Sequence, residues 1–597
     1  MSQSPPDSDG MSLFPAITAN GAELPDTVQV VELRIRRAVR TIGRCTLRFF
    51  DPGYELTTSG KIKVGTSIRV AAKADSRGAT TATVFEGKVT SMGVETRNAD
   101  QPELVVIAED VAYELSRSAR AATYLKQTAS QIISKALSDA NVKSSVVSTT
   151  GMLDYTLQTD SNLAFVDELC RRNGLDWEVD GSTFHVWAAP GASEPEVPTS
   201  PPVSTLAIGN DLLEFSAKVY GDAPQTVTVR GWDHLNKQEV VGKATLARKG
   251  VPDGLSSMLE AHSIPEATVL DAQAGPVDQS DAKVLAIASS AATGTVLARG
   301  VCPVNPLLRP GVTVTVANAG PASGDYYVRE VEHTYRGSGF HTAFVAGDRE
   351  PGSIVASQGA PATSSFRHDG VVVGLVSAIS DDPDNAGRVK VSLPGLDATI
   401  ESQWARLAVL GGGAKRGMVF LPEVHDEVLV AFEGGDVRRP VVLGGLFGKK
   451  DAIPAELVAD GAVAHRRLTS RLGHVVELAD GTEPSTQHIR LALAGNAISL
   501  RLGKDRADLK LPSGVPLKIV SGESSIELDG NGAITLSGTT IALKGQQSVT
   551  IEGMEVTAKA TTKFAASGAQ VEVKGEATAT LQASGITAVK GAMVQIN

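Results

Sequence analysis

The chain has 597 residues, enough for three or more domains, with 4% aromatic residues, 59 glycines and a formal net charge of −11. This acidic balance argues against nucleic acid as the main partner, because such a partner requires a basic face. Cys45, Cys170 and Cys302 lie far apart with no CxxC pair, which indicates buried thiols from a reducing compartment and neither disulfides nor a metal site.

Residues 1–25 form a polar, proline-bearing tail. The tail lacks the basic start and the apolar core of a secretory signal, and the chain contains no 18-residue apolar run that could span a membrane. We therefore expect synthesis and folding in the cytosol.

Residues 26–190 are predicted to form a first β-rich domain. Alternating apolar and polar residues predict strands in the runs VQVVELRIRR, CTLRFFD, SIRVAAKA, TATVFEGKVTSMGVET and ELVVIAEDVAYEL. Apolar residues at helical spacing predict helices at 128–140 and at 161–172, the second capped by Ser161.

A proline-rich linker at 191–205 separates this domain from a second β-rich domain at 206–350. The second domain is predicted to contain strands in QTVTVRGW, GVTVTVAN, DYYVREVEHTY and HTAFVAG, and a helix at 279–292. A linker at 351–368 follows, then a compact β-barrel at 369–448 and a neck at 449–515.

The last segment, 516–597, has a strict repeat. Apolar residues recur alternately eight and seven positions apart, each with an apolar or small partner two places on and a polar or small residue between. Glycine or alanine falls at most corners, so the pattern predicts a strand and a sharp bend in every unit. The predicted inward positions are Ile526, Leu528, Ile534, Leu536, Ile541, Leu543, Val549, Ile551, Val556, Phe564, Val571, Val573, Leu581, Ile586, Val594 and Ile596.

One short strand per unit supplies too few inward side chains for a core within one chain. The repeat therefore favours three chains wound into a triangular β-helix needle, and thus an intertwined homotrimer. A single-chain β-solenoid with three units per coil remains open from the sequence alone.

Other motifs favour structural roles. The run 381–385 (DDPDN) lacks a ligand before Gly387 and indicates a polar turn more than a calcium loop. The run 411–417 lacks the spacing of a phosphate loop, and the ten histidines form no ligand cluster. Arg438 and Arg439 are expected in a solvated turn. No catalytic, cofactor-binding or metal-binding residue is assigned, and no cofactor is expected.

The barrel segment resembles a known family. The runs GVVVGLVSAISDDPDNAGRVKVSLPG, QWARLA and GMVFLPEVHDEVLVAFEGGDVRRPVVLGGLFG are similar to the OB-fold of VgrG proteins, the spikes of type VI secretion and related contractile injection systems. Its hallmark positions here are Trp404, Arg406, Gly417, Pro422, Asp436, Pro440 and Gly444.

Other segments extend the resemblance over nearly the whole chain. Residues 155–180, 213–233 and 324–347 look like the hub domains of phage tail-spike proteins and the late control D family. Residues 470–481 are similar to the family's neck, and the terminal GAMVQIN is typical of its needles.

The resemblance implies a mainly β homotrimer with two hub barrels per chain, an OB-fold and a β-helix. Its implied partners are a hexameric inner tube or tube-initiator protein, baseplate proteins, a PAAR-type tip protein and effector cargo, with no nucleic acid. The target membrane would be met only during puncture. The tip protein is expected to dock on Val594, Gln595, Ile596 and Asn597.

The implied function is non-enzymatic: the spike and baseplate hub of a contractile injection system, phage-tail-like or type VI-like, which plugs the inner tube and punctures the target envelope. The expected location is a phage-tail-like particle assembled in the cytoplasm, which can be released extracellularly. The alternatives are a tail-associated cell-wall hydrolase and a receptor-binding fibre. Some phage spikes carry a lysozyme domain between the OB-fold and the needle, but here only about twenty residues (449–468) lie in that place, and the chain stops at its last inward position. We therefore expect neither an inserted enzyme nor a fused effector.

Overall fold

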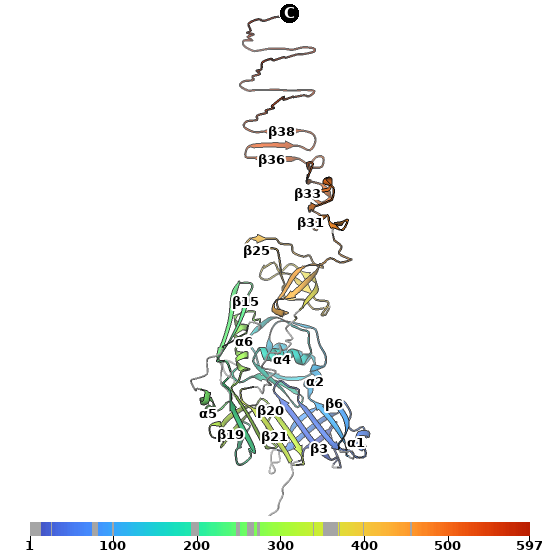
Figure 1. Ribbon diagram of the computed structural model, residues 1–597, viewed down its shortest axis with the longest axis vertical. Helices are drawn as coiled ribbons and strands as arrows, with labels where there is room; N and C mark the ends of the chain where they lie inside the picture. Colours follow the sequence, from blue (N-terminus) through green and yellow to red (C-terminus); the bar gives the residue numbers. More distant parts are fainter. Residues whose placement is uncertain are drawn as a thin grey trace, which may run out of the picture. The chain divides into compact units, whose positions relative to one another are not determined.

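A computed structural model describes residues 14–25, 27–73, 81–97, 101–192, 202–221, 223–245, 251–259, 268–271, 275–337, 339–349, 368, 370–397, 399–453 and 456–596. Most of the predicted tail, most of both predicted linkers and the docking residue Asn597 lie outside the described residues. The chain divides into two compact units, Met1–Lys449 and Lys450–Asn597. Both are mainly β, as the sequence predicted (Figure 1).

A 13-stranded sheet dominates the first unit. Eleven strands follow one another across it, while β13 pairs with β19 and β19 pairs with β20. In spatial order the eleven are β14 (Glu214–Val219), β18 (Val296–Pro303), β21 (Gly339–Ala346), β20 (Gly324–Arg336), β3 (Val30–Ala38), β4 (Arg44–Phe50), β7 (Gln101–Glu109), β6 (Thr81–Arg97), β5 (Ser67–Lys73), β1 (Ala16–Ala19) and β2 (Ala22–Glu23); the branch strands are β13 (Ser204–Ala207) and β19 (Thr313–Ala317).

Strand alternation explains how this sheet packs. Leu33 and Ile35 of β3 and Leu47 and Phe49 of β4 are fully buried in one core, while the residues between them point to the other face. β20 pairs with β3, so the sheet joins strands from both ranges predicted as hub domains. The three cysteines are free and buried, as the sequence predicted.

The predicted longer helices are confirmed, with one correction at a strand end. α3 (Ala129–Asp139) starts with a capping box at Thr128, Ser161 caps α4 (Asn162–Arg172), and α6 covers Gln279–Ala291. The strand prediction through ELVVIAEDVAYEL was wrong at its end: Asp110 accepts from Ala112 N and starts helix α2 (Val111–Ser116). The shorter helices are α1 (Glu55–Thr58), α5 (Asp253–Ser256), η1 (Ser257–Leu259) and η2 (Gly320–Ala322).

Three smaller sheets complete the hub region, which is the part of the first unit before residue 368. They are β8 (Ala122–Thr128) with β10 (Met152–Gln158); β9 (Lys143–Val146) with β11 (Leu175–Asp180) and β12 (Thr183–Ala188); and β15 (Thr226–Asp233) with β16 (Gln238–Thr245) and β17 (Thr268–Asp271).

The predicted OB segment forms a five-stranded sheet in the order β23-β22-β27-β28-β24, with a separate hairpin β25–β26. We call it the OB barrel (residues 368–449). Its elements are β22 (Val371–Ala378), β23 (Lys390–Ser392), β24 (Arg406–Leu407), β25 (Gly412–Gly413), β26 (Arg416–Gly417), β27 (Glu427–Phe432), η3 (Glu433–Gly435) and β28 (Pro440–Gly445).

The second unit begins with a small hairpin and a five-stranded antiparallel neck sheet, β31 to β35 in sequence order, followed by a three-stranded sheet. The elements are β29 (Val458–Ala459), β30 (Ala462–Val463), β31 (His465–Thr469), β32 (Val475–Ala479), η4 (Pro484–Thr486), β33 (His488–Ala492), η5 (Ala494–Asn496), β34 (Ser499–Gly503), β35 (Ala507–Lys510), β36 (Leu517–Ser521), β37 (Ser524–Leu528) and β38 (Ile534–Ser537).

Within the described part of the repeat segment, the strands β36, β37 and β38 all lie before residue 538. Ile526 pairs with Leu536 and Leu528 with Ile534 in the β37–β38 hairpin. From residue 538 to 596, all of which are described, the single chain has no strand and runs as an open series of turns (Figure 1). Its backbone groups therefore lack ladder partners within one copy of the chain.

Candidate functional site

The predicted inward positions of the needle form an uncovered apolar row in the single chain. Each of the sixteen residues from Ile526 to Ile596 that the repeat singled out is 38–91% exposed. Contiguous apolar surface of this kind marks an interaction site in a soluble protein. The row therefore needs cover from outside the chain, and which chains supply that cover stays a prediction.

The predicted docking residues at the tip are also exposed. Val594 and Ile596 present apolar side chains to solvent, and Gln595 lies between them. Asn597 lies outside the described residues. Since residues 539–596 are all exposed in the single chain, both the docking role of these residues and the identity of the partner remain predictions.

The neck sheet has two faces of opposite character. One face carries Val476 and Leu478 of β32 and Ile489 and Leu491 of β33, each 43–47% exposed. The other carries buried Glu477 with arginine and histidine side chains around it. A sheet exposing a continuous apolar face is expected to pack against another surface.

The OB hallmark residues occupy different parts of the barrel. Arg406 of β24 forms an ion pair with Glu433, and the Nζ of Lys390 lies 5.7 Å from the centroid of the Trp404 ring. Gly417 has φ 137°, and a Cβ there would lie 2.1 Å from the carbonyl oxygen of Gly411, so the β25–β26 hairpin requires glycine.

The remaining hallmark residues lie in or near β28. Pro440 begins this strand, Gly444 pairs with Leu429 of β27, and Pro422 lies in the segment before β27. The carboxylate of Asp436, just before the strand, is buried; its Oδ2 accepts from the Nε and Nη2 of Arg438 at 3.1 and 2.7 Å, and its Oδ1 accepts from the backbone N and the Nε of Arg438. The hallmark residues are thus spread over the barrel and form no common pocket.

Arg438 corrects one sequence-based expectation. It is 8% exposed rather than solvated, and its Nη2 donates to the carbonyl of Gly275 at 2.9 Å. Its Nη1 lies 3.6 Å from Asp281 Oδ2 on α6, and Arg172 of α4 lies 3.7 Å from the same oxygen. Neighbouring aspartates raise the pKa of Arg438 above its ordinary value despite burial. We call this cluster the hub–barrel junction (Arg172, Asp281, Asp436, Arg438).

Apolar packing reinforces the junction. Tyr155 and Leu157 of β10 belong to the same hydrophobic cluster as Val391 and Val430 of the OB barrel. The hydroxyl of Tyr155 also donates to the carbonyl of Glu401 at 2.8 Å. The hub region and the barrel are therefore joined by a buried apolar core and a charged cluster together.

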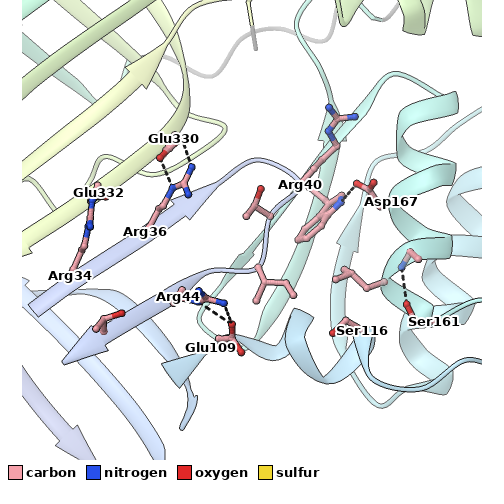
Figure 2. A pocket seen from close by; sticks show the side chains of 16 residues that line it. Arg34, Arg36, Arg40, Arg44, Glu109, Ser116, Ser161, Asp167, Glu330 and Glu332 are labelled. Atoms are coloured by element: carbon pink, nitrogen blue, oxygen red, sulfur yellow. Dashed lines mark hydrogen bonds and ion pairs between the residues drawn. The ribbon is translucent and has the colours of Figure 1, made fainter. Parts of the chain in front are cut away.

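A cavity of about 950 Å³ lies in the hub region beside β3 and α4 (Figure 2). Arg34 and Arg36 of β3 point toward Glu332 and Glu330 of β20, at 2.9 and 2.6 Å. These carboxylates raise the pKa of both arginines. Because Arg34 and Arg36 are already paired with carboxylates, their charge is neutralised, and this wall is a polar surface more than an anion site.

The polar side chains on the opposite wall of the cavity make hydrogen bonds within the hub region. Ser161 accepts from Ala164 N as the cap of α4, and Ser116 donates to the carbonyl of Tyr113. Asp167 accepts from the indole N–H of Trp177 at 2.9 Å, and burial raises its pKa. Both hydroxyls therefore serve the local fold.

The described residues contain no group of three or more His, Cys, Asp or Glu side chains suited to a metal ion. None of the helices in the described residues is long and apolar enough to cross a membrane.

The run 381–385 forms a turn in which Asp382 accepts from Ala386 N and pairs with Arg388. Burial alone would raise the pKa of Asp382, but the hydrogen bonds from Arg388 and from backbone N–H groups outweigh it and lower the pKa to about 2.

Two protein families match the chain. The family described as the type VI secretion system/phage-baseplate injector OB domain matches residues 372–447. The family described as the Alg8 N-terminal domain matches residues 11–337, more than half of the chain. The first match covers the OB barrel, so the resemblance inferred there from the sequence is confirmed.

Curated relatives share shorter segments. The type VI secretion system spike protein VgrG5 of Pseudomonas aeruginosa is 36% identical over 97 residues, 14% of this chain and 12% of the relative. The spike protein VgrG1a of the same organism is 28% identical over 127 residues, 21% of this chain and 19% of the relative. The matched segments thus span less than a fifth of the length of these relatives.

A solved structure agrees over more of the chain. A chain of the half-lidded Francisella PdpA–VgrG complex has a TM-score of 0.50 and 9% sequence identity, and the match covers 84% of this chain and 88% of that chain. At this identity the likeness concerns the fold. It extends the agreement well beyond the segment that matches the curated relatives.

Proposed function

Because the chain is a VgrG-like protein of contractile injection systems, we propose that it is the central spike and baseplate hub of such a machine. Over its first half the chain belongs to the Alg8 N-terminal domain family. In this role it plugs the inner tube and is driven through the target envelope when the machine contracts. The action is mechanical, and the chain contributes no catalytic step.

The observation that carries the proposal is the uncovered apolar surface of the second unit. The apolar face of the neck sheet and the apolar row of the repeat both lie exposed in one chain. Three chains related by a threefold axis would cover both surfaces with identical copies of themselves. Strands from neighbouring chains would also pair the backbone between residues 538 and 596, giving a closed rod without free edges.

A closed rod suits puncture. Bending it would require inter-chain hydrogen bonds to break together in each layer, so the needle resists buckling under an axial load. The hub–barrel junction would carry that load between the hub region and the barrel, since buried ion pairs and a shared apolar core hold the two together.

The partners are proposed on the same basis. A hexameric tube or tube-initiator protein and baseplate proteins would contact the hub, a PAAR-type tip protein would cover Val594–Asn597, and effector cargo would travel with the spike. The Francisella structure places VgrG in a complex with PdpA, which supports a search for cargo bound to this chain. The target membrane would be met only on puncture, and the finished particle can be released from the producing cell.

Mass measurement of the purified protein tests the proposal. Three chains of 62.1 kDa give about 186 kDa, and light scattering should report this mass after dilution as well. Negative-stain micrographs should show a hub with a thin rod. A stable monomer would contradict the architecture, and lytic bands in a zymogram would favour the hydrolase alternative.

A further inference from the structure

The charged face of the neck sheet carries a row of residues in register across four strands. Arg467 of β31 lies opposite Glu477 of β32, Glu477 lies opposite Arg490 of β33, and Arg490 lies opposite Arg501 of β34. Residues directly opposite one another in an antiparallel sheet share a face. We call Arg467, Arg490 and Arg501 the neck arginine row.

Two carboxylates share this face with the three guanidinium groups: Glu477 lies between Arg467 and Arg490, and Asp508 of β35 lies opposite Arg501. The Nε of Arg467 lies 3.7 Å from Glu477 Oε2, and the Nε of Arg490 lies 3.8 Å from Glu477 Oε1. The Nε2 of His488 is also 3.3 Å from Oε1. The next acidic residue in the row, Asp508, pairs with Arg506 at 3.1 Å. The row therefore carries more positive charge than its neighbours neutralise.

The donors of this row are poorly satisfied. The side chains of Arg467 and Arg490 are only 20% and 25% exposed, and their Nε atoms are shielded from solvent without a hydrogen-bond partner. Within the described part of the chain, neither guanidinium makes a hydrogen bond that meets ordinary distance limits. A buried donor left without a partner destabilises the fold, and a ligand that supplies acceptors would remove this cost.

Arg490 and Arg501 add a second unfavourable feature. They lie directly opposite each other on adjacent strands, where like charges destabilise a sheet. The Nη2 of Arg501 donates to the carbonyl of Ser485 at 2.8 Å, which orients the side chain without neutralising its charge. An anion between the two guanidinium groups would remove the repulsion and supply acceptors for their N–H groups.

We propose that the neck arginine row binds a phosphate-type oxyanion between Arg490 and Arg501, with Arg467 adding long-range attraction. Guanidinium groups match the geometry of phosphate oxygens with paired hydrogen bonds. Glu477 holds Arg490 in place by its ion pair and limits the site to one bound anion. The same chemistry is found in free phosphate and in the phosphoryl group of a lipid headgroup.

Equilibrium dialysis of the full-length protein against radiolabelled inorganic phosphate, in chloride buffer, tests the site. We expect saturable binding at about one phosphate per chain, weakened about tenfold or more in Arg490→Gln/Arg501→Gln, since each tenfold loss reflects about 1.4 kcal/mol. Arg466→Gln is the matched control, because Arg466 lies on the other face of β31 and pairs with Asp480. Absence of saturable phosphate binding, or equal binding by the double variant, would exclude free phosphate as the ligand. The proposal would then stand only if binding to anionic vesicles depends on Arg490 and Arg501.

The second arm separates the two sources of phosphate. Flotation with phosphatidylglycerol vesicles, compared with phosphatidylcholine vesicles, shows whether an anionic lipid headgroup occupies the site. Row-dependent binding to phosphatidylglycerol alone assigns the headgroup as ligand, and row-dependent binding of free phosphate alone assigns the free anion. If neither phosphate binding nor vesicle binding depends on Arg490 and Arg501, the site is excluded.

The thermal unfolding temperature gives a second measurement of phosphate binding that does not rely on dialysis. Phosphate should raise the Tm of the wild type and of Arg466→Gln but not of Arg490→Gln/Arg501→Gln, because a ligand stabilises only the state that binds it. A Tm rise of equal size in all three proteins would show general ionic screening and contradict a site.

Discussion

Arg438 of the OB barrel and Asp281 of helix α6 form an ion pair across the boundary between barrel and hub region, with 3.6 Å between Nη1 and Oδ2. Arg172 of α4 approaches the same Asp281 oxygen, and Asp436 approaches Arg438 from the barrel side. The four side chains come from three parts of the chain that are far apart in sequence. Their alternating charges hold each other in a buried setting.

The first prediction concerns Arg438→Met. Removing Arg438 takes from Asp436 its ion-pair partner and leaves Asp281 with Arg172 alone, so the free energy of unfolding should fall by about 3–5 kcal/mol. Calorimetry should show separate melting of the barrel and the hub region in the variant. Arg416→Met, at an exposed position on the β25–β26 hairpin, should leave the melting profile unchanged.

Adding Asp436→Asn to Arg438→Met refines this prediction. The double variant removes one uncompensated carboxylate and should recover part of the lost stability, because the penalty comes from the unpaired charge. If Arg438→Met melts like the wild type, the junction contributes no coupling between the barrel and the hub region.

The second prediction concerns the needle. Asp at Val549 or Ile551 would bury three like charges at one level of the proposed trimer, which is strongly unfavourable. Both variants should fail to form the rod in micrographs, while Thr550→Asp, on the outward side of the same unit, should form it. Equal behaviour of all three variants would mean that the assigned strand register is wrong.

The third prediction concerns the tip. Deleting residues 592–597 should leave the mass in light scattering at the trimer value but abolish co-purification of a PAAR-type tip protein. The physical reason is that the final layer presents exposed Val594 and Ile596, an apolar edge that a partner must cover. Recovery of the tip protein with the truncated chain would place its docking surface elsewhere.

The fourth prediction concerns pH and Asp110. This buried side chain accepts from Gly43 N and Ala112 N, and burial raises its pKa to about 7. Between its ordinary pKa and about 7, the folded state holds a proton that the unfolded state has released. The contribution of Asp110 to stability must therefore fall as pH rises through this window, by up to about 1.4 kcal/mol per pH unit.

The measurement for Asp110 compares the wild type with Asp110→Asn in chemical unfolding at pH 5, 6 and 7. The asparagine does not titrate, so the wild type should lose stability relative to the variant as the pH rises. Subtracting the variant removes the contribution of other groups, such as buried His333, whose pKa is lowered to about 3. A constant difference across the three pH values would show that the carboxyl of Asp110 titrates in its ordinary range.

Local patterns in the sequence determined the mainly β class, the three long helices and the OB segment. The helices at 128–140, 161–172 and 279–292 were predictable because capping residues and apolar spacing act within a few neighbours. The end of β7 was missed, because apolar residues continue on both sides of Asp110, whose side chain caps a helix. The repeat could also be recognised from neighbouring residues, because the sequence of each unit predicts one strand and one bend.

Only the tertiary structure decided which distant charges meet. Arg438 looked like a surface turn residue beside Arg439, and its burial depends on Asp281, more than 150 positions earlier in the chain. The neck arginine row likewise depends on strand register, which aligns Arg467, Arg490 and Arg501 although their spacing in sequence shows no motif. Burial and cross-strand pairing are set by the whole fold, and so the charged clusters could not be predicted from neighbouring residues.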